Sequence, residues 1–128
     1  MSNNLGRYRL GDKQRIADKA SFARVLRSRL RVQAGRLALQ AAGNEGEAGR
    51  LGVAIAKRYA KRSVDRNWVK RAVREAFRNH SIKYYPADFL VSLRGPLGGR
   101  KRTEERAAVH ADIITLFEKA ALLVIKSP

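Results

Sequence analysis

The chain has 128 residues, and its 28 Lys and Arg residues outnumber its 11 Asp and Glu residues to give a formal net charge of +17. That length fits one compact domain over residues 1–128, and that charge attracts polyanions, with nucleic acid the first candidate and an anionic membrane surface the second. The chain lacks cysteine, which excludes disulfides and thiolate metal sites, and it offers neither an apolar run of about 18 residues nor a signal peptide, so we expect a cytoplasmic protein without a membrane partner.

The first half of the chain predicts a loose basic lead-in, one helix and a strand. Residues 1–15 are basic and have little to bury, whereas apolar residues recur at three- and four-residue steps over 16–29, which indicates a helix. Alternating residues over 36–42 predict a strand, and the Gly-, Asn- and Glu-rich stretch 42–49 predicts a flexible turn. A further short strand is an open alternative around residues 30–32.

Residues 51–58 predict a strand with two different faces. Large aliphatic side chains point one way and small residues the other, so the small face lets something approach the backbone closely. A helix packed over that face and a bound strand of nucleic acid are equal alternatives. The large residues are Leu51, Val53 and Ile55, and the small residues are Gly52, Ala54 and Ala56. A basic link toward the next helix contains Lys57, Arg58, Lys61 and Arg62.

The central stretch 63–79 predicts a two-sided helix, because it contains neither Gly nor Pro. Ser63 is a suitable N-cap, and Asp65 lies in the first turn, where the helix dipole favours an anion. At roughly 100° per residue, Phe77 falls at one seam between the two sides and Trp68 near the other. The apolar side holds Val69, Ala72, Val73 and Ala76, and the polar side holds Arg66, Asn67, Lys70, Arg71, Arg74 and Arg78. A basic stripe of this kind is typical of nucleic-acid binding.

The second half predicts a turn, a strand, a basic loop and a long helix. The turn is at 84–86, and the strand spans 87–93 with Phe89, Val91 and Leu93 on one face. A Gly-containing basic loop at 94–103 leads to the last helix, for which Thr103 is the predicted N-cap and a Glu pair occupies the first turn. The order α-β-β-(β)-α-β-α predicts an α+β sandwich of helices and one sheet.

Enzymatic machinery is sparse in this chain. The two imidazoles, His80 and His110, have no neighbours at metal-ligand spacing, and the acidic residues are scattered, whereas metal-dependent nucleases cluster carboxylates. The Gly-containing segment 95–99 lacks the Lys-Ser/Thr pair of a phosphate loop. His80 is better interpreted as a helix-end residue. We therefore predict no catalytic residue and no metal ligand in the protein.

The basic side chains suit RNA better than DNA. Arg outnumbers Lys, and its planar fork matches phosphate oxygens. No zinc finger, heptad zipper or helix-turn-helix pattern is present, and RNA is recognised mainly through shape and phosphate contacts. Aromatic residues that could stack on bases, or could instead belong to the core, are Phe22, Tyr59, Trp68, Tyr84 and Tyr85.

The centre of the chain resembles the bacterial ribonuclease P protein subunit, and the resemblance extends over about residues 10–124. The family pattern is a strand that ends in small residues and Lys, here Leu51-Gly-Val-Ala-Ile-Ala-Lys57, followed by a helix reading R-N-x-x-K-R-x-x-R-E-x-F-R. The matching helix residues are Arg66, Asn67, Lys70, Arg71, Arg74, Glu75, Phe77 and Arg78.

The resemblance implies a fold and a role. The implied fold is a four-stranded mixed sheet with three helices and a left-handed βαβ crossover, the ribonuclease P protein and ribosomal S5 domain 2-like type; such crossovers are right-handed in nearly all other proteins. The implied role is the non-catalytic protein subunit of an endoribonuclease that removes the 5′ leader of precursor tRNA. The implied partners are ribonuclease P RNA and precursor tRNA, with catalysis by the RNA subunit and its Mg²⁺ ions.

The resemblance also implies two RNA-binding surfaces. The signature helix faces the catalytic RNA, and Trp68 belongs to it although the family most often has Arg there. A cleft between the first helix and the sheet holds the leader, where Leu26 and Gln40 replace residues that are usually aromatic. The cleft candidates are Phe22, Lys57, Arg58, Lys61 and Arg62. A structural RNA-binding protein of the ribosomal kind and a protein-only nuclease are the alternative hypotheses.

Overall fold

The computed structural model describes residues 15–16, 18–46, 48–97 and 101–126, so the basic lead-in predicted over 1–15 lies outside the described residues except for Arg15. The described elements follow the predicted order α-β-β-β-α-β-α and include the short strand that the sequence left open. They are α2 (Lys19–Leu26), β1 (Leu30–Ala34), β2 (Leu37–Gly43), β3 (Arg50–Ala54), α3 (Ser63–Arg78), the 3₁₀ helix η2 (Ser81–Tyr84), β4 (Ala87–Leu93) and α4 (Arg102–Lys126).

The four strands form one mixed sheet in the order β1-β2-β4-β3. β2 pairs antiparallel with both β1 and β4, so Leu39 lies opposite Val32 on one side and Val91 on the other. β3 pairs parallel with β4, and Val53 is aligned with Val91. The connection between these two parallel strands runs through α3 and η2, as the family resemblance implied; its left-handed sense stays a prediction.

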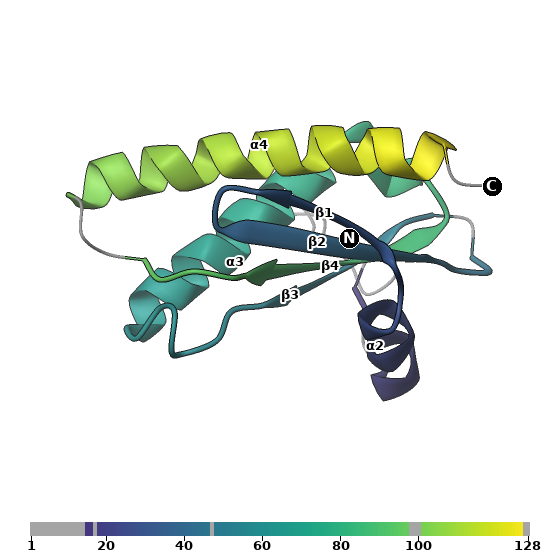
Figure 1. Ribbon diagram of the computed structural model, residues 1–128, viewed down its shortest axis with the longest axis horizontal. Coiled ribbons are helices and arrows are strands. Elements are labelled where there is room, and N and C mark those ends of the chain that lie inside the picture. The colour runs from purple at the N-terminus through teal and green to yellow at the C-terminus, as the bar shows by residue number, and fades with distance from the viewer. Residues whose placement is uncertain (1–14, 17, 47, 98–100, 127–128) are drawn as a thin grey trace, which may run out of the picture.

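Helices lie on both faces of the sheet, and each face has its own apolar cluster (Figure 1). The larger cluster joins one face to α3 and α4, and the Phe77 ring packs between Phe89, at 5.9 Å between centroids, and Phe117, at 6.1 Å. On the other face, Phe22 and Val25 of α2 pack against β2 and β4. The strand alternation predicted from sequence is confirmed in β4, because Phe89, Val91 and Leu93 enter the larger cluster whereas Leu90 between them enters the smaller one.

Several element ends differ from the predictions. The predicted N-cap Ser63 is the first residue of α3, and Arg62 occupies the N-cap position without a side-chain cap. Thr103 is likewise inside α4, which begins at Arg102. The first helix starts only at Lys19, because Asp18 caps it and accepts a hydrogen bond of 2.9 Å from the Ser21 amide. The strand predicted over 51–58 ends at Ala54 and turns.

Phe77 also differs from its prediction: it was expected at the seam between the two sides of the helix, but its side chain is fully buried. The reason is α4, which packs beside α3 and widens the buried sector of that helix. The turn predicted at 84–86 is preceded by η2, whose N-cap is His80; its Nδ1 accepts a hydrogen bond of 3.0 Å from the Ile82 amide. Within the described residues, no helix has both the length and the apolarity needed to cross a bilayer.

Candidate nucleic-acid interface

The helix α3 separates its apolar and cationic sides as predicted. Val69 and Val73 are fully buried against the sheet and α4, while Asn67 and Arg71 are exposed on the opposite side. The remaining polar-side residues, Arg66, Trp68, Lys70, Arg74 and Arg78, are half-buried. The predicted residues of the signature helix therefore share one accessible surface, which we call the α3 stripe.

Two members of the α3 stripe have intramolecular partners. Arg66 Nη1 donates to the carbonyl oxygens of Ala60 and Lys61, each at 2.9 Å, and so braces the loop that leads into α3. Arg78 forms an ion pair of 2.5 Å with Glu75, and this hydrogen bond is the first cause that lowers the pKa of Glu75. Both cations thus have a structural contact in addition to any contact with RNA.

The middle of the α3 stripe carries cations that repel one another. Lys70, Arg71 and Arg74 have no hydrogen bond or ion pair within the part of the chain that the structure describes. Burial and then the nearby charge of Arg15 lower the pKa of Arg74. Arg15 is held beside α3 by its pairing with Leu51 at the edge of β3. An anion between these groups would relieve the repulsion.

The predicted leader cleft begins where α2 meets the sheet. A Cβ built on Gly52 would lie 3.0 Å from the Phe22 ring, so the helix packs directly over the smallest position of the small-residue face. Ala54 and Ala56 continue that face and are exposed. The helix alternative is thus confirmed at Gly52, whereas Ala54 and Ala56 stay accessible and the binding of nucleic acid there stays a prediction.

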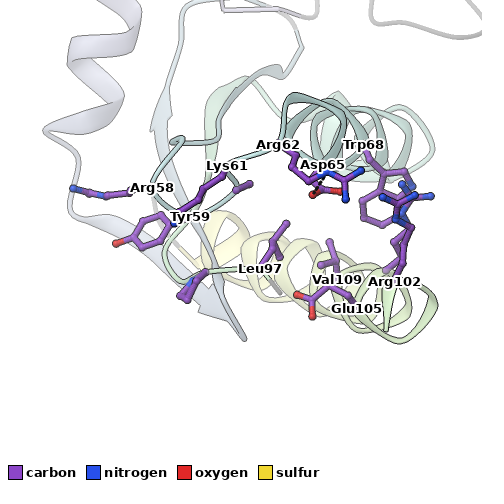
Figure 2. A pocket seen from close by; sticks show the side chains of 13 residues that line it. Arg58, Tyr59, Lys61, Arg62, Asp65, Trp68, Leu97, Arg102, Glu105 and Val109 are labelled. Atoms are coloured by element: carbon purple, nitrogen blue, oxygen red, sulfur yellow. Dashed lines mark ion pairs between the residues drawn. The ribbon is translucent and has the colours of Figure 1, made fainter. Parts of the chain in front are cut away.

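The structure does not bring the five predicted cleft residues together in one place. Phe22 packs on the α2 side of the sheet, and Lys57 is exposed in the turn after β3. The other three, Arg58, Lys61 and Arg62, line a separate cavity of about 560 Å³ between the starts of α3 and α4 (Figure 2). The prediction grouped them with Phe22, but Phe22 does not line this cavity.

Trp68 forms one wall of this cavity (Figure 2). The Arg106 guanidinium lies over its ring, 4.8 Å from the centroid, and His110 meets it edge-on at 5.1 Å. The Trp68 side chain therefore links α3 to α4. Sequence reasoning identified Trp68 as an edge residue but had no signal for Arg106 and His110.

A buried carboxylate that sequence reasoning missed fixes α2 to the sheet. Asp88 in β4 is fully buried and accepts hydrogen bonds from Arg24 Nη2 at 2.6 Å, Arg50 Nε at 2.8 Å and Arg50 Nη2 at 2.7 Å. Asn44 Nδ2 adds a fourth at 2.9 Å. The hydrogen bond to Asp88 is the first cause that raises the pKa of Arg50. The only sequence signal was an acid inside an apolar strand.

The described part of the chain has no assembled metal site. No group of three or more His, Asp or Glu side chains lies close enough there to hold a metal ion. His80 caps η2 and packs 5.9 Å from the Phe117 ring, which confirms its interpretation as a helix-end residue.

Comparison with known proteins decides the family. A family model described as Ribonuclease P matches residues 10–121. The ribonuclease P protein component of Nitrosomonas europaea is 33% identical over 109 residues, which cover 85% of this chain and 87% of that protein. The protein of the same name from Azoarcus sp. is 36% identical over 114 residues, covering 88% and 86%.

The chain belongs to the ribonuclease P protein family.

Other matches to this family are shorter or are structural. The Thioalkalivibrio sulfidiphilus ribonuclease P protein component is 42% identical over 67 residues, only 52% of this chain and 56% of that protein. The solved Staphylococcus aureus RNase P protein superposes with a TM-score of 0.69 at 24% identity, covering 87% and 92%. The Thermotoga maritima RNase P protein gives 0.61 at 22%, covering 89% and 97%. These structures share the fold.

The three departures from the ribonuclease P family pattern fall in two places. Trp68 borders the cavity between α3 and α4. The other two touch each other, because Gln40 Nε2 donates to the Leu26 carbonyl oxygen at 3.2 Å. Leu26 leaves 58% of its surface exposed at the end of α2. Leu26 thus presents an aliphatic side chain at the place where the resemblance implied an aromatic one.

Proposed function

We propose that the chain is the non-catalytic protein subunit of a ribonuclease P ribonucleoprotein. It binds the catalytic RNA subunit and the 5′ leader of precursor tRNA, and it assists the endonucleolytic removal of that leader. The observation that carries this proposal is the α3 stripe, in which the family signature residues stand on the accessible side of a helix whose Val69 and Val73 are fully buried.

The physical contribution of the protein is charge neutralisation and positioning. Two RNA molecules that meet at a cleavage site repel each other through their phosphates. The α3 stripe supplies cations to one of them, and the cleft between α2 and the sheet offers Phe22 and the exposed strip at Ala54 to the other. Each neutralised phosphate releases counterions, so affinity falls steeply as salt rises. The chemistry belongs to the RNA subunit and its Mg²⁺, and the proposed location is the cytoplasm.

Reconstitution tests this proposal. Purified protein is mixed with a bacterial ribonuclease P RNA and precursor tRNA at low Mg²⁺, and leader release is measured. We expect stimulation by the wild-type protein and reduced stimulation by Arg71→Ala. The matched control is Lys119→Ala, which removes an exposed cation of α4 whose Nζ donates to the Gln33 carbonyl at the opposite edge of the sheet.

Each failure has a defined meaning. Tight binding without stimulation would replace the proposal with a structural RNA-binding protein of the ribosomal kind. Mg²⁺-dependent cleavage by the protein without RNA would replace it with a protein-only nuclease. Equal loss in Arg71→Ala and Lys119→Ala would refute the assignment to the α3 stripe while leaving a general charge effect.

A further inference from the structure

The cavity between the starts of α3 and α4 is a preformed recess. The Leu97 amide donates to the Tyr59 carbonyl at 2.8 Å, which ties the loop after β4 to the loop after β3. Arg36 Nη1 bonds the Pro96 carbonyl at 2.7 Å and pairs with Glu105 at 2.6 Å, which braces the loop against α4. These bonds hold the walls in position without a ligand.

The interior of the cavity is apolar and its edge is cationic. Leu97 and Val109 point into its centre, and Trp68 stands at one side (Figure 2). Five cationic side chains line it against two carboxylates, and one of those carboxylates, Glu105, is paired with Arg36, which lies outside the lining. The cations are Arg58, Lys61, Arg62, Arg102 and Arg106.

An apolar interior with a cationic edge fits a ligand that has a flat apolar group attached to an anion. The volume of about 560 Å³ falls within the range of small-molecule sites. An aromatic wall within a positively charged groove is how single-stranded nucleic acid is bound, because any base can stack while the backbone phosphates meet cations. A free fatty or aromatic acid would satisfy the interior but would leave most of the cations unpaired.

We propose that this cavity receives one unstacked nucleotide of the ribonuclease P RNA subunit, with its base beside Trp68 and its phosphates at the Arg58–Arg62 edge. The RNA subunit is chosen over the leader because Trp68 also belongs to the α3 stripe, so the cavity continues that surface. Phe22 and the cleft strip do not line the cavity. This inference rests on the proposed function, and it adds a base contact to a surface otherwise argued from phosphates.

Trp68 is the sole tryptophan of the chain, so it reports its own surroundings. The full-length protein is titrated with ribonuclease P RNA alone, and separately with a single-stranded leader RNA alone, while intrinsic fluorescence and binding are both recorded. We expect the RNA subunit to quench Trp68 as it binds and the leader RNA to leave it unchanged. Quenching by the leader instead would overturn the assigned source.

Variants separate base stacking from charge. Trp68→Ala should weaken binding of the RNA subunit by about 5- to 100-fold without changing the slope of log affinity against log salt, because no counterion release is lost. Trp68→Phe should recover most of the affinity, and circular dichroism checks that Trp68→Ala is folded. Arg71→Ala should instead lower the slope by about one.

The outcomes distinguish this inference from the proposed function. Tight, salt-dependent binding of the RNA subunit with unchanged Trp68 fluorescence and an unaffected Trp68→Ala variant would overturn the nucleotide site and leave the proposed function standing. Absence of binding to the RNA subunit at low salt would overturn both.

Discussion

Replacing Asp88 with alanine removes the acceptor shared by α2, β3 and the loop after β2. Its carboxylate is fully buried and receives four side-chain hydrogen bonds, from Arg24, Arg50 and Asn44. The two guanidinium groups are brought together by this acid, so Asp88→Ala removes the shared counter-charge of two neighbouring cations and leaves Arg50 with only the longer ion pair to Asp18, at 3.8 Å.

The magnitude follows from burial. Removing one partner of a buried ion pair costs about 3–5 kcal/mol. The side chains of Arg24 and Arg50 are 39% and 28% exposed, so water can replace part of what they lose. We expect Asp88→Ala to lower the free energy of unfolding by about 2–4 kcal/mol, a large share of the stability of a domain of this size. Asp88→Asn keeps one acceptor and should cost less.

Urea denaturation followed by circular dichroism measures this change. The urea concentration at the unfolding midpoint should fall, while the dependence of the free energy of unfolding on urea concentration stays constant. A constant dependence shows that the stability of the folded state has changed and the denatured state has not. Glu118→Ala is the matched control, since Glu118 is an exposed acid of α4 and its loss should change stability by less than about 0.5 kcal/mol. If Asp88→Ala matched Glu118→Ala, the carboxylate would not hold α2 to the sheet.

Three further predictions test the core, the cleft and the cap of α2. Val73→Asp buries an unpaired charge at a fully buried position and should cost more than about 4 kcal/mol, so cooperative unfolding would be lost in a thermal melt; a folded variant would contradict the face assignment. Gly52→Leu must displace the Phe22 ring, so binding of precursor tRNA should weaken more than binding of the RNA subunit; equal effects would contradict the cleft. Hydrogen bonds from Ser21 lower the pKa of Asp18 below 3.8, so this cap stabilises α2 above that pH and is lost as the pH falls through the lowered pKa. The difference in urea midpoint between wild type and Asp18→Ala should therefore close in acid, and a constant difference would refute the ionic cap.

Local periodicity predicted most of the fold. The alternation of Leu37 and Leu39 in β2 and the two-sided pattern of α3 are properties of neighbouring residues, and both are confirmed. Phe77 was misplaced because its burial depends on Phe117, forty residues further along the chain, and the pattern of one helix cannot report the helix beside it.

The sequence predicted only the part of the candidate interface that lies along a single helix, α3. Residues of the α3 stripe were found because a single periodicity orders them. The Asp88 network was missed because its donors lie 38, 44 and 64 positions away. The cavity at Trp68 was missed for the same reason, since the Tyr59–Leu97 hydrogen bond that closes it joins two loops.

The salt dependence of binding to ribonuclease P RNA tests the central claim most directly. The affinities of the wild-type protein and of a Lys70→Ala/Arg71→Ala double variant are measured across a range of salt concentrations, with circular dichroism to confirm that both are folded. If the α3 stripe meets RNA phosphates, the variant should bind more weakly and its slope of log affinity against log salt should fall by about two, one for each lost cation. An unchanged slope in a folded double variant would contradict the account.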